Sequence, residues 1–331
     1  MPSPQIQRRR SIGAVATAIA LAGFTPLAAF AQAGWPTKPI RLIVPFPAGG
    51  GTDIIARELR NKMSSTGWNI IVDNKPGSGG NIGVDAAAKS PADGYTLVLG
   101  QTSNLAINPT LYSKLPYDPR KDLTPISSVA TSPLVLVVAA DSPFKTLAEV
   151  VAAAKAKPDT LNYATSGNGT VAHLAMEMFQ RQAKVKMTHI PYKGAAQGAN
   201  DLIGGLVQLY TSSVPTLINH IRSGRMRAIA VTSAVRADDL PDVPTVAESG
   251  YKDFAAATWF GVLGPAGMPK DVVAKLNAEI NKALELPDFR KRLGEQGAEV
   301  LGGSPEEFAS LINEELDRWG KVVKESGAKA E

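Results

Sequence analysis

The feature that most constrains the fold of this chain is a repeated order of short apolar strand, glycine-rich loop and helix. The first repeat has a β-branched run over residues 40–44, the loop sequence PFPAGGGTD over residues 45–53, and then apolar residues at a spacing of four, which is a helical period. Two further strands of this kind are predicted over residues 69–73 and 95–99. Strands that alternate with helices form a parallel, doubly wound sheet, so the sequence predicts an α/β fold.

The same pattern restarts in the middle of the chain. A new apolar run begins near Leu134, and loops and helical patterns again separate the strands that follow. Such a restart predicts a second lobe with its own sheet. The predicted strands of this lobe cover residues 134–138, 162–165, 208–213 and 228–232.

The last part of the chain is helical, over residues 271–284 and 304–324. These helices need a sheet to cover, and the first lobe has too few helices for its two faces. We therefore expect the chain to cross to the second lobe near residues 125–135 and to return near 255–262, as a hinge of paired strands. The predicted boundaries are residues 34–133 plus 258–331 for lobe I and residues 134–257 for lobe II.

The N-terminus has the order of a secretory signal. Arg8–Arg10 precede an uncharged stretch from Ser11 to Thr37, and small-x-small sites end at Ala31 and Ala33. This order predicts a signal peptide over residues 1–33, cleaved near Ala31 or Ala33, and a periplasmic location. An uncleaved membrane anchor is the alternative, because the uncharged run is long enough to span a bilayer. The general and the twin-arginine export routes both remain open.

The charge of the chain argues against a nucleic-acid partner. The formal net charge is +5, but Arg8–Arg10 contribute three of these charges, and the rest of the chain has 32 basic and 30 acidic residues. A nucleic-acid surface needs a concentrated excess of basic residues. Aromatic residues make up only 6% of the chain, too few for a platform on which bases stack.

The residue types and motifs of enzyme chemistry are scarce. The chain has no cysteine, and its three histidines lie far apart in the sequence, so it has neither a thiolate nucleophile nor a zinc motif. The spacings of a P-loop, a dinucleotide-binding loop, a nucleophile elbow and an EF-hand are also missing. We therefore expect a binding protein without metal or cofactor. An enzyme that uses Asp53 and His173 across the crevice is the alternative.

Three glycine-rich loops have the features of anion-binding sites. They cover residues 48–53, 78–83 and 166–170, and each lies between a predicted strand and a predicted helix. At a helix N-terminus the backbone N–H groups are unpaired, and the helix dipole also favours an anion. In a doubly wound sheet these loops lie where ligands bind. Each loop also has a purely structural alternative, because turns need glycine.

Five polar side chains near these loops each allow two interpretations. Asp53 either contacts a ligand or caps its own helix. His173 either contacts a ligand or hydrogen-bonds its own loop. Thr170 is a helix cap, a ligand hydroxyl or both. Lys193 either neutralises a carboxylate or is a solvated turn residue, and Asp201 either meets a ligand ammonium group or stabilises its own helix.

Several stretches of the chain resemble one protein family. They are WPTKPI at 35–40, PFPAGGGTD at 45–53, NKPGSGG at 74–80, ADGYTL at 92–97, PYKG at 191–194, DLIGG at 201–205, LPDVPTV at 240–246 and GVLGP at 261–265. In these stretches the chain resembles the Bug (TctC-like) family, the substrate-binding proteins of tripartite tricarboxylate transporters. The stretches cover essentially the whole chain after the signal segment.

The resemblance implies a two-lobed periplasmic-binding-protein fold (type II-like), in which each lobe is a doubly wound mixed sheet flanked by helices and two hinge crossings join the lobes. It also implies a monomer that closes on a small carboxylate and delivers it to the membrane permease subunits of a tripartite tricarboxylate transporter. The ligand classes left open are di- or tricarboxylates, aromatic carboxylates and amino acids. A sensor that presents its ligand to a membrane receptor is the alternative.

The resemblance also implies which loops hold the ligand. The loop from Phe46 to Asp53 would hold one carboxylate, and the loops at 78–81 and 102–103 would add contacts from the same lobe. The second lobe would shape the far end of the ligand, although Tyr210–Ser213 departs from the family's usual sequence. Together with His173, these loops form the predicted site: Phe46, Ala48, Gly49, Gly50, Thr52, Asp53, Ser78, Asn81, Thr102, Ser103, Ser166, Gly169, Thr170, His173, Tyr192, Lys193, Gly194 and Asp201.

Overall fold

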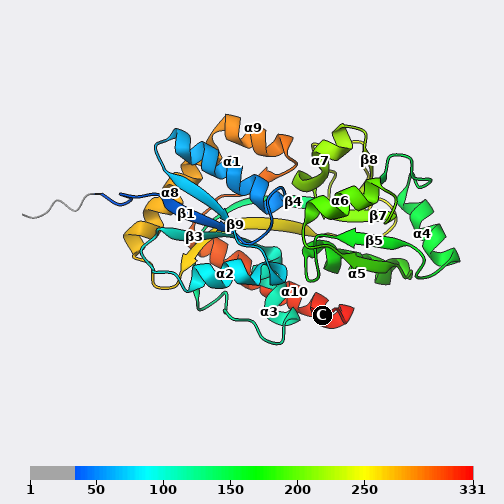
Figure 1. Cartoon of the computed structure of the whole chain (residues 1–331), viewed down its shortest axis with the longest axis horizontal. Helices are drawn as coiled ribbons and strands as arrows, with labels where there is room; N and C mark the ends of the chain where they lie inside the picture. Colours follow the sequence, from blue (N-terminus) through cyan, green and yellow to red (C-terminus); the bar gives the residue numbers. More distant parts are fainter. Residues whose placement is uncertain (1–33, 331) are drawn as a thin grey trace, which may run out of the picture. The chain divides into compact units, whose positions relative to one another are not determined.

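A computed structural model of the chain describes residues 34–330 (Figure 1). The predicted signal peptide and its cleavage sites lie outside the described residues. Residues 34–37 contain no helix or strand and belong to a unit separate from the rest, whereas the chain forms one compact unit from Lys38 onward. No helix within residues 34–330 is long and apolar enough to cross a membrane.

The first part of this unit is a parallel sheet. Strand β1 (Ile40–Val44) pairs in parallel with β2 (Ile70–Asn74) on one side and with β3 (Thr96–Gln101) on the other. Helix α1 (Gly51–Ser65) follows β1, and α2 (Asn81–Ala88) follows β2. Both helices pack on β1, whose apolar side chains are buried, as expected for a parallel sheet covered on both faces. The strands predicted here are confirmed, with ends that differ by at most two residues.

Strand β4 (Leu123–Ala139) is longer than the sequence predicts. A separate strand was expected over residues 134–138, but it is the second half of one strand of 17 residues. The first half is hidden in the sequence because serines, threonines and prolines interrupt its apolar pattern. The protein satisfies these hydroxyls internally; for example, Ser132 Oγ donates to the carbonyl of Gly297 at 2.6 Å.

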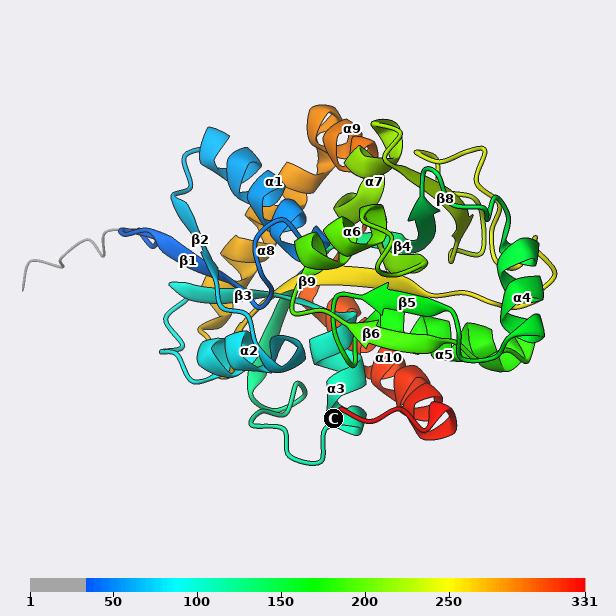
Figure 2. The same ribbon diagram turned by 45° about the vertical axis from the view of Figure 1, so that its right-hand side comes forward.

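Strand β9 (Ala257–Pro265) joins the two parts of the sheet. It is antiparallel to β3 and to the first half of β4, whereas the second half of β4 is antiparallel to β7 (Leu209–Ser213) and β8 (Met226–Val231). The strand order is β2-β1-β3-β9-β4-β7-β5-β6, and β9 runs from one group of elements to the other in Figure 2. The predicted pairing of the two crossing segments is therefore confirmed.

The second part of the unit repeats the strand–helix order. Strands β5 (Asn162–Thr165) and β6 (Thr188–Pro191) are parallel to each other, and β5 is also parallel to β7. Helix α7 was not singled out in the sequence, because it begins directly after β7 with no loop between them. The helices of this part are α4 (Leu147–Ala156), α5 (Val171–Ala183), α6 (Ala195–Ile203) and α7 (Val214–Arg222).

The C-terminal helices return to the first part of the sheet, as predicted. They are α8 (Lys270–Glu285), α9 (Pro287–Glu295) and α10 (Pro305–Ser326). Helices α8 and α10 both contact β4, and α10 also packs on the turn over Ser103–Ile107 and on α3 (Asn108–Leu111). Helix α10 begins with a capping box, in which Ser304 and Glu307 each accept a hydrogen bond from the other's backbone amide. Helix α9 and the short strand β10 (Glu299–Val300) were not predicted.

Candidate functional site

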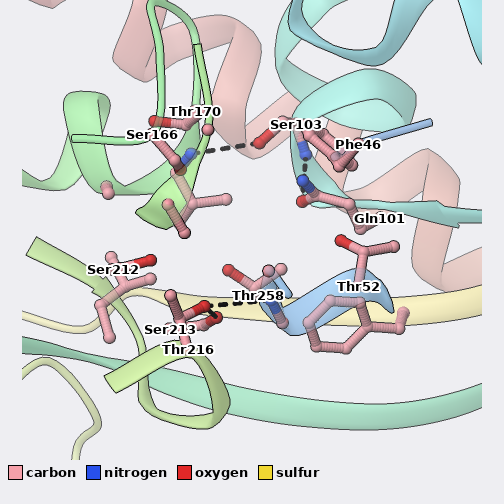
Figure 3. A pocket seen from close by; sticks show the side chains of 18 of the residues that line it. Phe46, Thr52, Gln101, Ser103, Ser166, Thr170, Ser212, Ser213, Thr216 and Thr258 are labelled. Carbon is pink, nitrogen blue, oxygen red and sulfur yellow. Dashed lines mark hydrogen bonds between the residues drawn. The ribbon is translucent and has the colours of Figure 1, made fainter. Parts of the chain in front are cut away.

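A cavity of about 60 Å³ lies where the carboxyl ends of strands from both parts of the sheet meet (Figure 3). This inner cavity is reached by the ends of β3 and β7, by β9 and by the N-termini of four helices. Its lining residues are Phe46, Pro47, Gly50, Gly51, Thr52, Gln101, Ser103, Leu134, Ser166, Thr170, Val171, Ala172, Gly194, Ala195, Ser212, Ser213, Thr216, Thr258 and Phe260.

No ionisable side chain is among the residues that line the inner cavity. The polar side chains there are eight hydroxyls and the amide of Gln101. Figure 3 shows these hydroxyls on opposite walls, with Ser103 and Ser166 on one side of the view and Ser212 and Thr258 on the other. A charged ligand in this cavity would therefore meet only neutral hydrogen-bonding groups.

The N-termini of α1, α5, α6 and α7 converge on the inner cavity. Gly51 and Thr52 open α1, Val171 and Ala172 open α5, and Ala195 opens α6. Helix α7 contributes through its N-cap residue and its first turn. Each N-terminus presents backbone N–H groups without intrahelical partners and the positive end of a helix dipole. Four such ends make the cavity attractive for anions without a single cationic side chain.

Two hydrogen bonds connect the two parts of the unit across the inner cavity. The amide of Gly51 in α1 donates to Thr216 Oγ1 in α7 at 3.0 Å, and the amide of Val171 in α5 donates to Ser103 Oγ at 3.2 Å. A side chain at Gly51 would overlap Ser213 Oγ. The two parts of the unit are therefore in direct contact at the walls of the inner cavity.

A second, outer cavity of about 550 Å³ adjoins the inner one. The two share Phe46, Pro47 and Ser166 as lining residues. Among the residues from 34 to 330, Lys193 is the only cationic side chain that lines the outer cavity, and none of its lining residues is acidic.

Ten residues of the predicted site line one or both cavities. Those that line the inner cavity are Phe46, Gly50, Thr52, Ser103, Ser166, Thr170 and Gly194. Those that line the outer cavity are Phe46, Ser166, Ser78, Tyr192 and Lys193.

The other residues of the predicted site line neither cavity. Asn81 accepts hydrogen bonds from Asn108 and Tyr117, and Thr102 Oγ1 accepts from the amide of Trp259 at 3.0 Å. These side chains hold the lining segments in place. The predicted site residues that line neither cavity are Ala48, Gly49, Asp53, Asn81, Thr102, Gly169, His173 and Asp201.

Asp53 has a structural position in this fold. It is only 3% exposed, and its carboxylate accepts hydrogen bonds at 2.9 Å from the amide of Gly49, from Arg57 Nε and from Asn74 Nδ2. Burial raises the pKa of Asp53, but the hydrogen bonds from Arg57, Gly49 and Asn74 outweigh this effect and hold the pKa below its usual value. Through its hydrogen bond with Gly49 the carboxylate holds the loop before α1 in place. Asp53 does not line the inner cavity.

His173 and Asp201 are likewise engaged within the protein. His173 Nδ1 accepts a hydrogen bond from the amide of Gly169 at 3.3 Å, which is the contact with its own loop that the sequence allowed. Asp201 accepts a hydrogen bond from the Tyr192 hydroxyl at 2.7 Å. Burial and this carboxylate raise the pKa of Tyr192 to about 12, so the phenol is neutral at the edge of the outer cavity.

Several lining residues were not predicted from the sequence. Ser212 and Ser213 end β7, directly before the N-terminus of α7. A strand end followed by a helix start was the signal, but this junction has no glycine. Thr258 and Phe260 lie in the interior of β9, where nothing in the sequence distinguishes them. Within residues 34–330 no cluster of three or more metal-ligating side chains occurs.

Known proteins resemble this chain along most of its length. Residues 55–328 match the family described as "Tripartite tricarboxylate transporter family receptor". Protein BugT from Bordetella pertussis is 41% identical over 297 residues, which are 89% of this chain and 91% of BugT.

Solved structures share the fold. The R. palustris protein Rpa4515 with adipate has a TM-score of 0.87 and 36% identity, over 89% of this chain and 99% of that one. MatC from Rhodopseudomonas palustris with bound malate has a TM-score of 0.81 and 33% identity, over 87% and 99% of the two chains. These relatives are two-lobed solute-binding proteins and not enzymes, so the enzyme alternative with Asp53 and His173 is set aside. The chain belongs to the tripartite tricarboxylate transporter receptor (TctC, Bug) family of periplasmic solute-binding proteins.

Proposed function

We propose that this protein captures a small carboxylate between two lobes in the periplasm and delivers it to the membrane permease subunits of a tripartite tricarboxylate transporter. Lobe I comprises residues 34–133 and 258–331, and lobe II comprises residues 134–257. The observation that carries the proposal is the convergence of four helix N-termini on a cavity in whose lining the described residues place no ionisable side chain.

The inner cavity favours a carboxylate for an electrostatic reason. A carboxylate has two oxygens that together accept about four hydrogen bonds, and helix N-termini supply oriented backbone amides that have no partner within their own helix. Hydroxyls such as Ser103 and Ser166 supply further donors. A cation would meet the positive ends of the helix dipoles and would be repelled. The adipate and the malate bound to two relatives are ligands of the class that this cavity favours.

We assign the carboxylate contacts to the lining residues of both lobes. Lobe I contributes the loop from Phe46 to Thr52 together with Gln101 and Ser103, and lobe II contributes the N-termini of α5, α6 and α7. Lys193 at the outer cavity meets the part of a longer ligand that extends past Phe46. Asp53, His173 and Asp201 act indirectly, because they hold these segments in position.

A thermal-shift screen of the chain from residue 34 tests the proposal. The panel contains adipate, malate, longer and shorter dicarboxylates, aromatic carboxylates and amino acids, with the matching amides as uncharged controls. A ligand at 100 times its dissociation constant stabilises the folded protein by about 2.7 kcal/mol. We expect a rise in Tm with one class of carboxylate and none with its amide. Equal shifts with acids and amides would contradict an anion-specific site.

Transport is tested in cells that lack the gene. We expect them to lose uptake of the carboxylate that gives the largest shift, and plasmid-borne wild-type protein to restore it. Normal uptake together with a lost transcriptional response to the ligand would instead support a sensor.

A further inference from the structure

Two of the three histidines of the chain lie face to face behind the loop over residues 166–170. The rings of His173 in α5 and His189 in β6 have centroids 4.1 Å apart and planes inclined by only 9°. The ring of Tyr163 in β5 stacks on His189 at 4.9 Å. The loop in front of this stack contributes Ser166 and Thr170 to the inner cavity. The stack thus supports a segment to which we have assigned ligand contacts.

Each histidine makes a hydrogen bond that fixes one side of the loop. The amide of Gly169 donates to His173 Nδ1 at 3.3 Å, and an acceptor nitrogen has no proton. His173 is therefore neutral, with its proton on Nε2. His189 Nε2 lies 2.7 Å from Thr165 Oγ1, and this hydroxyl oxygen also accepts a hydrogen bond from the amide of Gly167 at 3.3 Å.

The surroundings of the stack disfavour positive charge. His173 is 7% exposed, and the titratable groups that face the pair are Tyr163, the opposite histidine and Glu177, whose carboxylate lies 4.0 Å from His173 Nε2. Glu177 already accepts hydrogen bonds from Tyr163 and Gln180. Burial lowers the pKa of His173 although Glu177 opposes the shift, and burial and His173 together lower the pKa of His189 to about 3.

We propose that His173 is the positioning residue of the 166–170 loop, and that protonation of the His173–His189 pair in acid releases this loop and weakens capture of the ligand. A proton on His173 Nδ1 removes the acceptor of the Gly169 amide, and a second positive ring 4.1 Å away repels the first. The inference rests on the proposed function, because the released loop no longer presents Ser166 and Thr170 to a carboxylate.

The size of the effect follows from linkage. A histidine with its ordinary pKa of about 6.5 in the released loop and, like His189, a pKa of about 3 in the bound loop favours release by about tenfold more at pH 5.5 than at pH 7.5. The lowered pKa of His173 acts in the same direction. Ligand affinity falls with the fraction of competent loop, up to the same factor.

Hydrogen exchange of the ligand-free protein tests the loop directly. We expect the opening equilibrium of the peptide over residues 163–175, corrected for intrinsic exchange, to rise by about tenfold or more between pH 7.5 and 5.5. In His173→Asn the side-chain oxygen takes the place of Nδ1 as an acceptor that does not titrate, so the rise should be smaller in this variant than in the wild type. His220→Asn is the matched control, because this histidine lies at the far end of α7, and it should behave as the wild type.

Calorimetry with adipate, and with malate if adipate does not bind, tests the consequence for capture. The ionisation of the ligand itself changes over this pH range, but it is the same for every variant. We expect the ratio of affinities at pH 7.5 and 5.5 to be several-fold smaller in His173→Asn than in His220→Asn. His189→Gln, which keeps a donor at the Nε2 position, should reduce the ratio in the same way.

Two results would overturn the inference. One is an opening equilibrium of the loop that does not change between pH 7.5 and 5.5 in the wild type. The other is a pH dependence, of exchange or of affinity, that is the same in His173→Asn and His220→Asn. If no carboxylate binds at pH 7.5, the proposed function fails, while the exchange experiment still decides whether His173 positions the loop.

Discussion

Gly51 lies where α1 contacts the N-terminus of α7, so its replacement by alanine tests whether ligand binding brings these two helices together. A Cβ at Gly51 would overlap the hydroxyl oxygen of Ser213 and would lie 3.4 Å from Thr216 Oγ1. Ser213 avoids the overlap only by rotating away, and this rotation breaks its 3.1 Å hydrogen bond with Thr216. The closed form of the protein is thereby destabilised, whereas a form with separated lobes is not.

The magnitude follows from these two contacts. The lost hydrogen bond is worth about 1 kcal/mol, and the crowding adds up to about 1 kcal/mol. Since 1.4 kcal/mol is a factor of ten, a cost of about 1–2 kcal/mol weakens ligand binding by about 5- to 30-fold. The folded chain should not lose stability, because alanine is favoured over glycine in a helix by about 0.5–1 kcal/mol.

A double-mutant cycle measured by calorimetry separates this mechanism from a general disturbance of the site. Its ligand is the carboxylate with the largest thermal shift. Ser213→Ala removes the overlapping hydroxyl together with its hydrogen bond to Thr216, so we expect Gly51→Ala/Ser213→Ala to bind the ligand about as tightly as Ser213→Ala alone. Gly294→Ala in α9 is the control, because a Cβ there meets no atom within 4 Å and Gly294 lines neither cavity. Additive losses in the cycle, or an equal loss in Gly294→Ala, would refute the reasoning.

Three further predictions concern stability. Asp53→Ala leaves the donors of Gly49, Arg57 and Asn74 without their acceptor and should lower the free energy of unfolding in urea by about 2–4 kcal/mol; a loss below about 1 kcal/mol would contradict the pinning of this loop. The buried histidines have lowered pKa values, so their contribution is complete above pH ~6.5 and is lost as the pH falls, by up to about 1.4 kcal/mol per pH unit for each ring; stability that is constant between pH 6.5 and 5.5 would show that these rings titrate normally. Glu315→Leu removes the acceptor of two buried indole N–H groups and should cost about 2–4 kcal/mol, and Glu315→Gln should cost less than half of this, both measured by tryptophan fluorescence in urea; equal costs would contradict the role of the acceptor.

The parts of the fold that the sequence predicts are those with a regular apolar pattern. The strand at Ile40–Val44 is almost continuously apolar, and it is found with the same bounds. The first half of β4 is also a buried strand, but Ser127, Ser128 and Ser132 lie within it. Their burial depends on acceptors distant in the sequence, such as the carbonyl of Gly297. A local pattern cannot reveal partners that only the folded chain brings together.

The candidate site, like the fold, was predictable from the sequence only where the signal is local. Glycine-rich loops predicted that Gly50, Ser166 and their neighbours belong to the site, because a loop between a strand and a helix has a local sequence pattern. Whether a side chain at such a loop faces the cavity or the protein interior is set by tertiary contacts. Asp53 faces the protein interior because Arg57 and Asn74 donate hydrogen bonds to its carboxylate. Thr216 faces the cavity because β7 runs into α7 without a loop, and no glycine marks that junction.

The four helix N-termini at the inner cavity are divided between the two parts of the unit, and this division has a consequence for release. Helix α1 belongs to the part built on β1, whereas α5, α6 and α7 belong to the part built on β5 and β7. Each dipole acts over little more than one helical turn. The positive field that would hold the proposed carboxylate is therefore complete only when the walls meet, and it weakens when the walls separate. A transporter that pulls the lobes apart would need no competing charge of its own, because opening alone leaves the ligand with a fraction of the field that captured it.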